Sequence, residues 1–513
     1  MKLFLRRNAP LFYALAAMLA LYIPWLNRGY LNWEWGTVLA GRGLSSSEDF
    51  YYLQAYKDSG HANPLGYPFM ISLINRVFGF SDVFWYSRVP SVVGALILLI
   101  WGFHELRRRD KFSPVIFYNW AVLIILNPMI FAFSTSATTD VPAAAFFLLS
   151  MLFLSKYYSK QKTKFVVLAA LAMGLSSSIK YITPFFAPMV LIIFVGLFSK
   201  RAVTWSKLVR DVLVFGTVAI SVLLVEILWK WRNTGVLLSA RNEEMAPNFL
   251  DLTVWMHTFG KYLSFLGLFC GILPFAFVRK SSNKTSRQIL FAISAAIVGF
   301  LGWVFSGRLP EGELDFGGGF PAVVFLSRAL QTFGFAGVTM LILVCIRRFQ
   351  LSDVVRRALM VGLVPYLVLL SASRPTQRYL MYAIPIVLLL LVEALDELPK
   401  KIKHFAISTT AVGFAIVSLW GMSYLTSQGN ASEEMAVWVE DNNLISQTSA
   451  GAIRPHAGQH WWGIEADETR YEIIAVTPSA EAQVKERILH REPMKVLGKV
   501  TRVYLLREKP GTP

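Results

Sequence analysis

Long apolar runs alternate with short polar segments along most of the chain, and many of the runs are long enough to cross a membrane. A bilayer core about 30 Å thick takes roughly 20 helical residues per crossing, and about 17 is the usual lower end. By this measure the pattern predicts about thirteen spans, of which the second and fifth are short enough to be tilted or re-entrant. Their approximate bounds are 10–26, 89–104, 114–133, 141–155, 165–179, 181–198, 212–229, 257–278, 288–306, 329–346, 358–372, 379–394 and 405–424.

Lysine and arginine gather before the first span and in every second loop after it. The segments are "MKLFLRR", "HELRRRDK", "KYYSKQKTK", "KRAVTWSKLVR", "RKSSNKTSR", "RRFQLSDVVRR" and "LPKKIK", each with three or four basic residues, whereas the opposite loops carry mixed charge. Basic loops stay on the cytoplasmic side during insertion. The pattern therefore predicts a plasma-membrane (inner-membrane) protein whose N-terminus is cytoplasmic and whose residues after the last span lie outside.

Composition agrees with this class. The chain is 55% hydrophobic and only 16% charged, with a mean hydropathy of +0.49, which exceeds what a soluble chain of this length carries. The net charge of +18 is explained by cytoplasmic basic clusters against anionic lipid headgroups, so no nucleic-acid partner is predicted. Cys270 and Cys345 fall inside predicted spans and imply packing residues rather than a disulfide framework.

The outer segments predict three parts: a transmembrane module over 1–424, a first outer loop over 27–88 within it, and an extracytoplasmic domain over 425–513. In the first outer loop, "FYYLQAY" and "YPFMISLINRVFGF" have apolar faces at helical spacing, which predicts amphipathic helices lying in the membrane interface. In the last part, "YEIIAV" and "RVYLLRE" are typical of strands and "PSAEAQVKERILH" of a helix. The expected fold is an all-α polytopic membrane module with a small C-terminal α/β domain.

Several segments resemble a known family. The acid of "SEDF", the aromatic-rich stretch after it, "NPLGYPFMISLINRVFG" and "SRVPSVVGALILL" resemble the first outer loop of integral-membrane glycosyltransferases of the GT-C fold. The closer resemblance is to the branch of protein O-mannosyltransferases and aminoarabinose transferases. The later segments "NPMIFAFSTSATTDVPAAAFFLLSMLFL", "GLSSSIKYITPFFAPMVLIIF" and "SRPTQRYLMYAIPIVLLL" are similar to that family as well. The resemblance extends to about residue 400 and implies a GT-C-like module.

The resemblance implies a cell-envelope transferase that moves a sugar from a polyprenyl-phosphate donor to an acceptor hydroxyl at the outer face of the membrane. A protein, a glycolipid and a polysaccharide all stay open as acceptors. The chain has no Walker-type or dinucleotide fingerprint, since "DFGGGF" lacks the Lys-Ser/Thr ending, and a lipid-anchored donor needs neither. Two alternatives stay open: a flippase or transporter for lipid-linked sugars, and an enzyme of the O-antigen ligase or polymerase type. A transporter is expected to place charges at the membrane midplane and to show two related halves.

Such a transfer needs a base for the acceptor proton and cations for the leaving phosphate. Asp49 is the first candidate base, because the family's loop-one aspartate maps onto it; the alternative is a helix cap. Glu48 is its neighbour, and Glu34 in "NWEWGT" also aligns with the acidic position of the family. Asp140 in "TTDVP" resembles the acid of the second outer loop, although the same residues are typical of a helix start.

Four residues are candidates for binding the donor phosphate. Lys180 stands alone between two apolar runs, where an unpaired charge is expensive without an anionic partner; the alternative is snorkelling to the interface. Arg378 in "QRY" presents a guanidinium, which matches phosphate oxygens in a bidentate manner, and Tyr379 is expected to help position the lipid phosphate. Arg88 precedes the second span, where the family also tends to have an arginine, and is a phosphate ligand or an interface anchor.

A third outer segment predicts a lid over the donor. Arg308 and Arg328 flank a loop rich in glycine and acid, including Glu313 and Asp315. A loop of this composition is expected to close over a bound sugar phosphate.

No metal site and no other cofactor is predicted. His456 and His460 in "HAGQH" have metal-ligand spacing if helical, but no nearby cysteine or carboxylate completes a set. Some members of the wider GT-C fold use a divalent cation, which the sequence leaves open.

Overall fold

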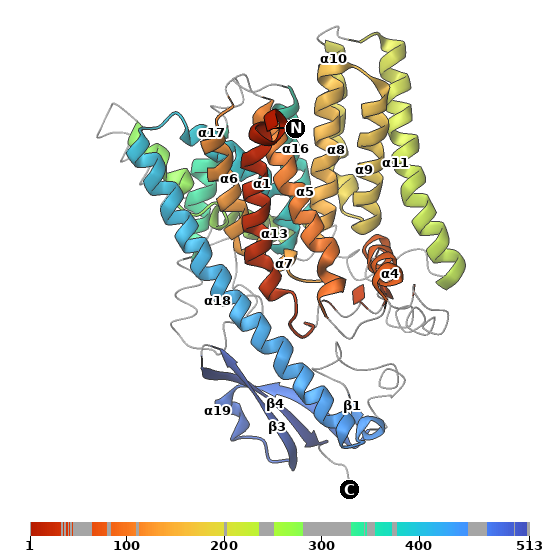
Figure 1. Cartoon of the computed structure of the whole chain (residues 1–513), viewed down its shortest axis with the longest axis vertical. Helices are drawn as coiled ribbons and strands as arrows, with labels where there is room; N and C mark the ends of the chain where they lie inside the picture. Colours follow the sequence, from red (N-terminus) through yellow and green to blue (C-terminus); the bar gives the residue numbers. More distant parts are fainter. Residues whose placement is uncertain are drawn as a thin grey trace.

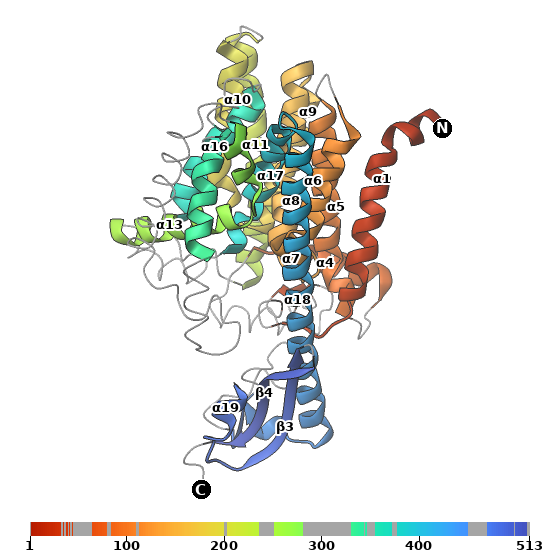
Figure 2. The ribbon, with the colours of Figure 1, turned by 90° about the vertical axis from the view of Figure 1, so that its left-hand side faces the viewer.

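The structure is a computed structural model of the full chain. It describes residues 2–31, 34, 37–38, 40–41, 44, 64–79, 84–108, 112–199, 203–234, 251–280, 330–342, 344–345, 354–371, 377–449, 469–496 and 498–509. A small sheet lies beyond one end of a bundle of helices and is attached to it through one long helix (Figure 1, Figure 2). The N-terminal end of α1 and the sheet lie at opposite ends of the bundle (Figure 1).

The α-helices are α1 (Lys2–Tyr22), α4 (Gly66–Phe78), α5 (Val89–Arg107), α6 (Pro114–Leu126), α7 (Pro128–Ser134), α8 (Asp140–Lys160), α9 (Thr163–Ile179), α10 (Ala187–Ser199), α11 (Trp205–Thr234), α13 (Leu252–Leu268), α16 (Val354–Ser371), α17 (Ala383–Leu395), α18 (Lys400–Asp441) and α19 (Pro478–Glu481). Short 3₁₀ turns join or begin several of them: η1 (Ile23–Trp25), η2 (Phe84–Arg88), η3 (Thr183–Phe186), η5 (Leu273–Lys280), η6 (Gln377–Tyr382) and η7 (Ile445–Gln447).

Among the described residues, six helices are long and apolar enough to cross a membrane, or seven if the bent pair α6–α7 forms one span. The outermost of them, α11, has an apolar outer surface: only 6% of its span is buried, and its Leu213, Ile220 and Val225 are exposed. A helix satisfies its own backbone hydrogen bonds, so such surfaces suit lipid. The chain is therefore a multi-pass membrane protein.

The predicted spans correspond to helices wherever the chain is described, with local differences. Shorter apolar helices at Thr163–Ile179, Thr183–Ser199 and Leu330–Ile342 occupy three predicted positions, so the count of thirteen stays a prediction. The predicted span 288–306 lies outside the described residues.

The expected continuous span over 114–133 is instead two helices bent by 63°. The break is at Asn127, whose side-chain oxygen accepts hydrogen bonds from the backbone amides of Met129 and Ile130. Pro128 follows at the first position of α7, and proline cannot donate the backbone hydrogen bond that would continue α6. An asparagine cap followed by proline therefore ends one helix and starts another.

The long helix α18 connects the bundle to the sheet. The predicted span over 405–424 is only part of it, because α18 continues without interruption to Asp441. At 1.5 Å per residue it is about 60 Å long, roughly twice a bilayer core. Its last turns pack on the sheet, where Met435 and Val439 contact a cluster that includes Ile473 and Leu506.

The sheet has the strand order β1-β2-β4-β3, with β1 and β2 parallel and the other pairs antiparallel. The strands are β1 (Thr448–Ser449), β2 (Tyr471–Val476), β3 (Ile488–Val496) and β4 (Lys499–Glu508). The expected strands "YEIIAV" and "RVYLLRE" correspond to β2 and β4. Both carry buried apolar residues under α18, which is the pattern that made them recognisable.

The helix expected over "PSAEAQVKERILH" is wrong beyond its first turn. Only Pro478–Glu481 is helical, and the chain enters β3 at Ile488. β3 pairs with β4 from Ile488 to Val496, so strand pairing prevails over a local helical spacing. Pro493 is tolerated within β3 because β3 stands at the end of the described strand order.

Within the first outer loop, the structure describes residues 27–31, 34, 37–38, 40–41, 44, 64–79 and 84–88. The stretch "YPFMISLINRVFGF" is helical from Tyr67 to Phe78 as part of α4, which buries Tyr67 and Ile71 and exposes Leu73 and Val77. Figure 1 shows α4 at the end of the bundle that faces the sheet. Its predicted place in the membrane interface stays a proposal, and "FYYLQAY" lies outside the described residues.

Candidate functional site

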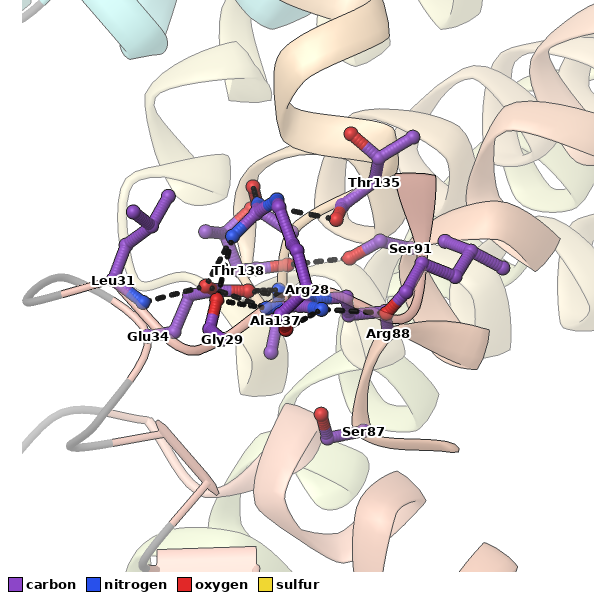
Figure 3. Close-up of polar contacts among 12 residues, drawn as sticks. Arg28, Gly29, Leu31, Glu34, Ser87, Arg88, Ser91, Thr135, Ala137 and Thr138 are labelled. Carbon is purple, nitrogen blue, oxygen red and sulfur yellow. Dashed lines mark hydrogen bonds and ion pairs between the residues drawn. The ribbon is translucent and has the colours of Figure 1, made fainter. Parts of the chain in front are cut away.

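A buried ion-pair network joins the loop after α1 to the start of α5 (Figure 3). Arg28 donates from Nη1 to Glu34 Oε2 at 3.0 Å, and Arg88 donates from Nε to Glu34 Oε1 at 2.9 Å and from Nη2 to Oε2 at 3.0 Å. All three side chains are buried. We call them the Glu34 network.

Backbone groups complete the Glu34 network. The amides of Leu31 and Ala137 donate to Glu34 at 2.9 and 2.6 Å. The two guanidiniums donate to the carbonyl oxygens of residues 26, 28, 29 and 135 and to the Ser136 hydroxyl. A buried charge is tolerated only when it is paired and hydrogen-bonded in this manner. The network therefore joins the first outer loop, η2 and the turn between α7 and α8.

Glu34 is ionised in this setting. Burial by itself raises the pKa of a carboxyl group, but the Arg28 and Arg88 guanidiniums and the Ala137 amide outweigh it and lower the pKa of Glu34 to about 2. Its two oxygens accept five hydrogen bonds from described residues. These donors leave little room for an acceptor hydroxyl to approach the carboxylate.

The Glu34 network also holds α18. The Gly29 amide donates to Asn430 Oδ1 at 3.2 Å. A Cβ on Gly29 would lie 2.3 Å from the Gly429 carbonyl oxygen, so the two backbones meet at a distance that only glycine allows. This contact fixes α18, and with it the sheet, against the first outer loop.

A second cluster contains four of the residues singled out in the sequence: Asp140, Lys180, Arg378 and Tyr379. Lys180 Nζ forms an ion pair with Asp140 Oδ1. The same ammonium lies 4.4 Å from the centre of the Tyr379 ring, and the Arg378 guanidinium lies 5.8 Å from that ring. We call this group the Asp140 cluster; it joins α8, the α9–η3 turn and η6.

Local structure explains how these residues meet. Asp140 is the first residue of α8, where the helix dipole favours an acid. Lys180 ends α9 in an extended conformation, with φ −154° and ψ 113°, and so leaves the helix axis. Thr183 Oγ1 and Tyr382 OH are hydrogen-bonded at 2.9 Å, and Phe186 stacks on Tyr366 at 3.9 Å. The Tyr366 hydroxyl donates to the Tyr379 carbonyl oxygen at 2.6 Å, so these aromatic side chains adjoin the cluster.

Two polar atoms of the Asp140 cluster stand out. Asp140 Oδ2 and Arg378 Nε are buried and have no hydrogen-bond partner among the described residues. Buried polar groups are normally hydrogen-bonded, because leaving one unpaired costs about 1–3 kcal/mol. Burial and the nearby Arg378 lower the pKa of Lys180, the Asp140 carboxylate opposes them, and the resulting value is about 8. The cluster thus offers two cations and a carboxylate oxygen to a polar ligand.

The remaining predicted site residues have different locations. Arg88 belongs to the Glu34 network, where its guanidinium donates hydrogen bonds to Glu34 and to backbone carbonyl oxygens. Outside the described residues lie Glu48, Asp49, Arg308, Glu313, Asp315, Arg328, His456 and His460. Within the described part of the chain, no group of three or more His, Cys, Asp or Glu residues is arranged to hold a metal.

Sequence reasoning missed Arg28 and its contact with Glu34. A signal was available, because "NRGYLNWEW" places an arginine and an acid six residues apart directly after an apolar span. Charges beside an apolar run are costly and tend to be paired. The sequence does not show that Arg88 is the third partner, because Arg88 lies 54 residues away from Glu34.

Residues 62–229 are similar to a known protein family. They match the family model described as dolichyl-phosphate-mannose-protein mannosyltransferase. This match confirms the family resemblance over these residues. It covers Arg88, Asp140 and Lys180, and it ends before Arg378 and Tyr379. A search of curated protein sequences finds no significant match.

Solved structures give similarities over longer stretches. ArnT from Cupriavidus metallidurans bound to undecaprenyl phosphate is 13% identical with a TM-score of 0.44, and the match covers 97% of this chain and 98% of that one. The oligosaccharyltransferase AglB from Archaeoglobus fulgidus, in complex with an inhibitory peptide and a dolichol-phosphate, is 14% identical with a TM-score of 0.40. That match covers 85% of this chain and 58% of the other.

Proposed function

We propose that this protein is a membrane glycosyltransferase that moves a sugar from a polyprenyl-phosphate-linked donor to an acceptor hydroxyl. The observation that carries the proposal is the Asp140 cluster. The Lys180 and Arg378 cations converge there with the Asp140 carboxylate. Arg378 Nε and Asp140 Oδ2 have no hydrogen-bond partner among the described residues. Guanidinium and ammonium groups are the side chains that bind phosphate. The family match, whose description names a dolichyl-phosphate sugar, supports the same class of donor.

In the proposed reaction, Lys180 and Arg378 bind the donor phosphate and Tyr379 lies beside both cations. The acceptor hydroxyl loses its proton to a carboxylate and attacks the anomeric carbon. The bond between that carbon and the phosphate oxygen breaks, and polyprenyl phosphate leaves with the negative charge that the two cations stabilise. No step requires a metal.

We assign the base to Asp49, with Glu48 as its neighbour and Asp140 as the second candidate. Asp140 already forms an ion pair with Lys180 through Oδ1, so one of its two carboxylate oxygens is occupied. Glu34 is assigned to anchoring, because it already accepts five hydrogen bonds, three of them from the two guanidiniums. Arg88 is assigned to anchoring for the same reason. The loop with Arg308, Glu313 and Asp315 stays our candidate for a lid.

A transfer assay tests the proposal directly. Purified protein in liposomes is given a polyprenyl-phosphate sugar labelled in the sugar, with glycolipid, polysaccharide and protein acceptors supplied separately. We expect label to become attached to an acceptor. Movement of intact donor across the bilayer without attachment would contradict the proposal and make the chain a carrier. Mass spectrometry of glycolipids and glycoproteins from cells with and without the gene then identifies the acceptor.

We further propose that the end of the bundle that faces the sheet is the extracytoplasmic end, because the basic segments alternate along the chain. A reporter that is active only in the cytoplasm should be active when fused after residue 110 and silent when fused at the C-terminus. The second fusion retains all of α18 and the sheet. Activity at both positions would contradict this orientation.

Lys180→Ala and Arg378→Ala are expected to weaken binding of the donor lipid by about tenfold to a hundredfold. Each removes a charge-assisted hydrogen bond to phosphate, worth about 1.5–3 kcal/mol. The measurement is equilibrium binding of labelled donor to purified variants. Lys403→Ala is the matched control, since Lys403 forms an ion pair with Asp396 at 2.8 Å outside the cluster. Unchanged affinity in both test variants would reduce these residues to structural anchors.

Donor affinity should also fall as the pH rises through about 8. Burial is the main cause that lowers the pKa of Lys180 to about 8. The ammonium is therefore mostly charged below that pH and mostly neutral above it. A phosphodiester keeps its single charge throughout this range, so the change comes from the protein. In Lys180→Arg the loss should disappear, because a guanidinium stays protonated. An identical pH profile in both proteins would show that Lys180 does not bind the phosphate.

A further inference from the structure

A third polar cluster lies next to the Asp140 cluster and has no role in the proposed reaction so far. Tyr181 OH donates to the Glu226 carboxylate, at 3.0 Å from Oε1 and 2.8 Å from Oε2. Lys230 Nζ donates to Tyr181 OH at 2.7 Å. The backbone amide of Leu65 also donates to Glu226 Oε1, at 3.0 Å. We call Tyr181, Glu226 and Lys230 the Tyr181 cluster.

Two charged members of the Tyr181 cluster lie on α11, where burying a charge costs free energy. Glu226 and Lys230 are one turn apart on the same face of α11, and both are buried. Elsewhere on this part of the helix, Val225, Leu228 and Trp231 are exposed. Charged residues in a largely apolar helix are rare and are usually retained for a purpose.

The backbone between the two clusters explains what that purpose is. Lys180 and Tyr181 are consecutive, and Lys180 is extended. Consecutive side chains of an extended backbone point in opposite directions. Lys180 contacts Asp140 and Tyr379, while Tyr181 contacts Glu226 and Lys230. The hydrogen bonds of the Tyr181 hydroxyl therefore limit rotation of the Lys180–Tyr181 peptide, and with it the direction of the Lys180 side chain.

The same contacts connect this turn to the first outer loop. Glu226 accepts a hydrogen bond from Leu65, directly before α4 begins. A Cβ on Gly66 would lie 2.6 Å from the Ser178 carbonyl oxygen, so α4 starts in direct backbone contact with the end of α9. Leu65, directly before α4, and Tyr181, directly after Lys180, are thus attached to one carboxylate.

We propose that Glu226, acting through the Tyr181 hydroxyl, is a positioning residue that aims the Lys180 ammonium at the donor phosphate. The proposal rests on the proposed function, because it assumes that Lys180 binds that phosphate. Glu226 does not touch the donor itself. Its effect passes through Tyr181 to the Lys180 backbone, and through Leu65 to the start of α4.

The test uses the purified full-length protein and undecaprenyl phosphate as the probe, with equilibrium binding as the readout. Tyr181→Phe removes only a hydroxyl, and we expect the Kd for the probe to rise about tenfold, which corresponds to one hydrogen bond. Tyr157→Phe is the matched control. Its hydroxyl donates to Asp211 Oδ2 at 2.5 Å, near the opposite end of the same helix α11. We expect its Kd to stay within about twofold of the unchanged protein, as for sites that do not interact.

A double-variant cycle separates positioning from general loosening of the fold. If Tyr181 acts through Lys180, Tyr181→Phe should have no further effect on the Kd in a Lys180→Ala background. Glu226→Gln should retain more affinity than Glu226→Ala, because the amide oxygen can still accept from Leu65 and Tyr181.

Three results would overturn the positioning role. They are an unchanged Kd in Tyr181→Phe, an equal loss in Tyr157→Phe, and additive losses in the double variant. Each leaves the proposed function intact if Lys180→Ala alone still weakens binding. If the unchanged protein does not bind the probe at all, the donor proposal fails together with this one.

Discussion

Asp49→Asn should yield a folded, membrane-inserted protein that binds the donor lipid normally and transfers sugar about 10²–10⁴-fold more slowly, the usual range for loss of a general base. Asparagine keeps the shape of the side chain and can still cap a helix, so the substitution spares a structural role. What it removes is the proton acceptor. The measurement is single-turnover transfer by purified variants, together with their thermal unfolding.

Two further variants decide which acid is the base. Glu48→Gln alters the adjacent carboxylate and should retain most of the transfer rate. Asp140→Asn should weaken donor binding, because it removes the partner of Lys180. Near-normal transfer by Asp49→Asn, combined with loss of transfer but not of donor binding in Asp140→Asn, would place the base on Asp140 instead.

Glu34→Gln should chiefly reduce stability. It leaves the Arg28 and Arg88 guanidiniums buried without a counter-charge, and breaking a buried ion pair by removing one partner costs about 3–5 kcal/mol. We expect a clearly lower temperature of thermal unfolding in detergent. Asp396→Asn is the control, because it removes an acid from the partly exposed Asp396–Lys403 pair, and such pairs contribute about 0–1 kcal/mol.

The pH dependence of this contribution has a defined sign. The pKa of Glu34 in the folded protein, about 2, lies below its ordinary value of 4.5. The stabilisation is therefore fully present above pH 4.5 and is lost as the pH falls through 2. If Glu34→Gln unfolds at the temperature of the unchanged protein but no longer transfers sugar, Glu34 is the base and the anchoring role is wrong.

The candidate residues of the Asp140 cluster were recognisable one by one, and their assembly was not. Lys180 stood out as a single charge between apolar runs, and Arg378 as a guanidinium beside a tyrosine. Asp140 and Arg378 are far apart in the chain, and the residues around each one do not indicate that the two lie close together in the fold. For Arg88 the sequence context left a phosphate ligand and an interface anchor open, and its pairing with Glu34 is visible only in the structure.

The sequence by itself determined that this is a helical membrane protein and where most of its helices lie. In lipid each span must satisfy its own backbone hydrogen bonds, so a span depends on a run of neighbouring apolar residues that can be recognised without knowledge of the fold. β2 was recognisable for a related reason, since one face of it is apolar. Only the tertiary structure decided that α18 continues to Asp441 and that the chain after α19 forms β3. It also decided that Glu34, Arg28 and Arg88 share one site. These features depend on which helix ends and strands meet in space, and pairing energies between residues far apart in the chain leave no periodic trace in the sequence.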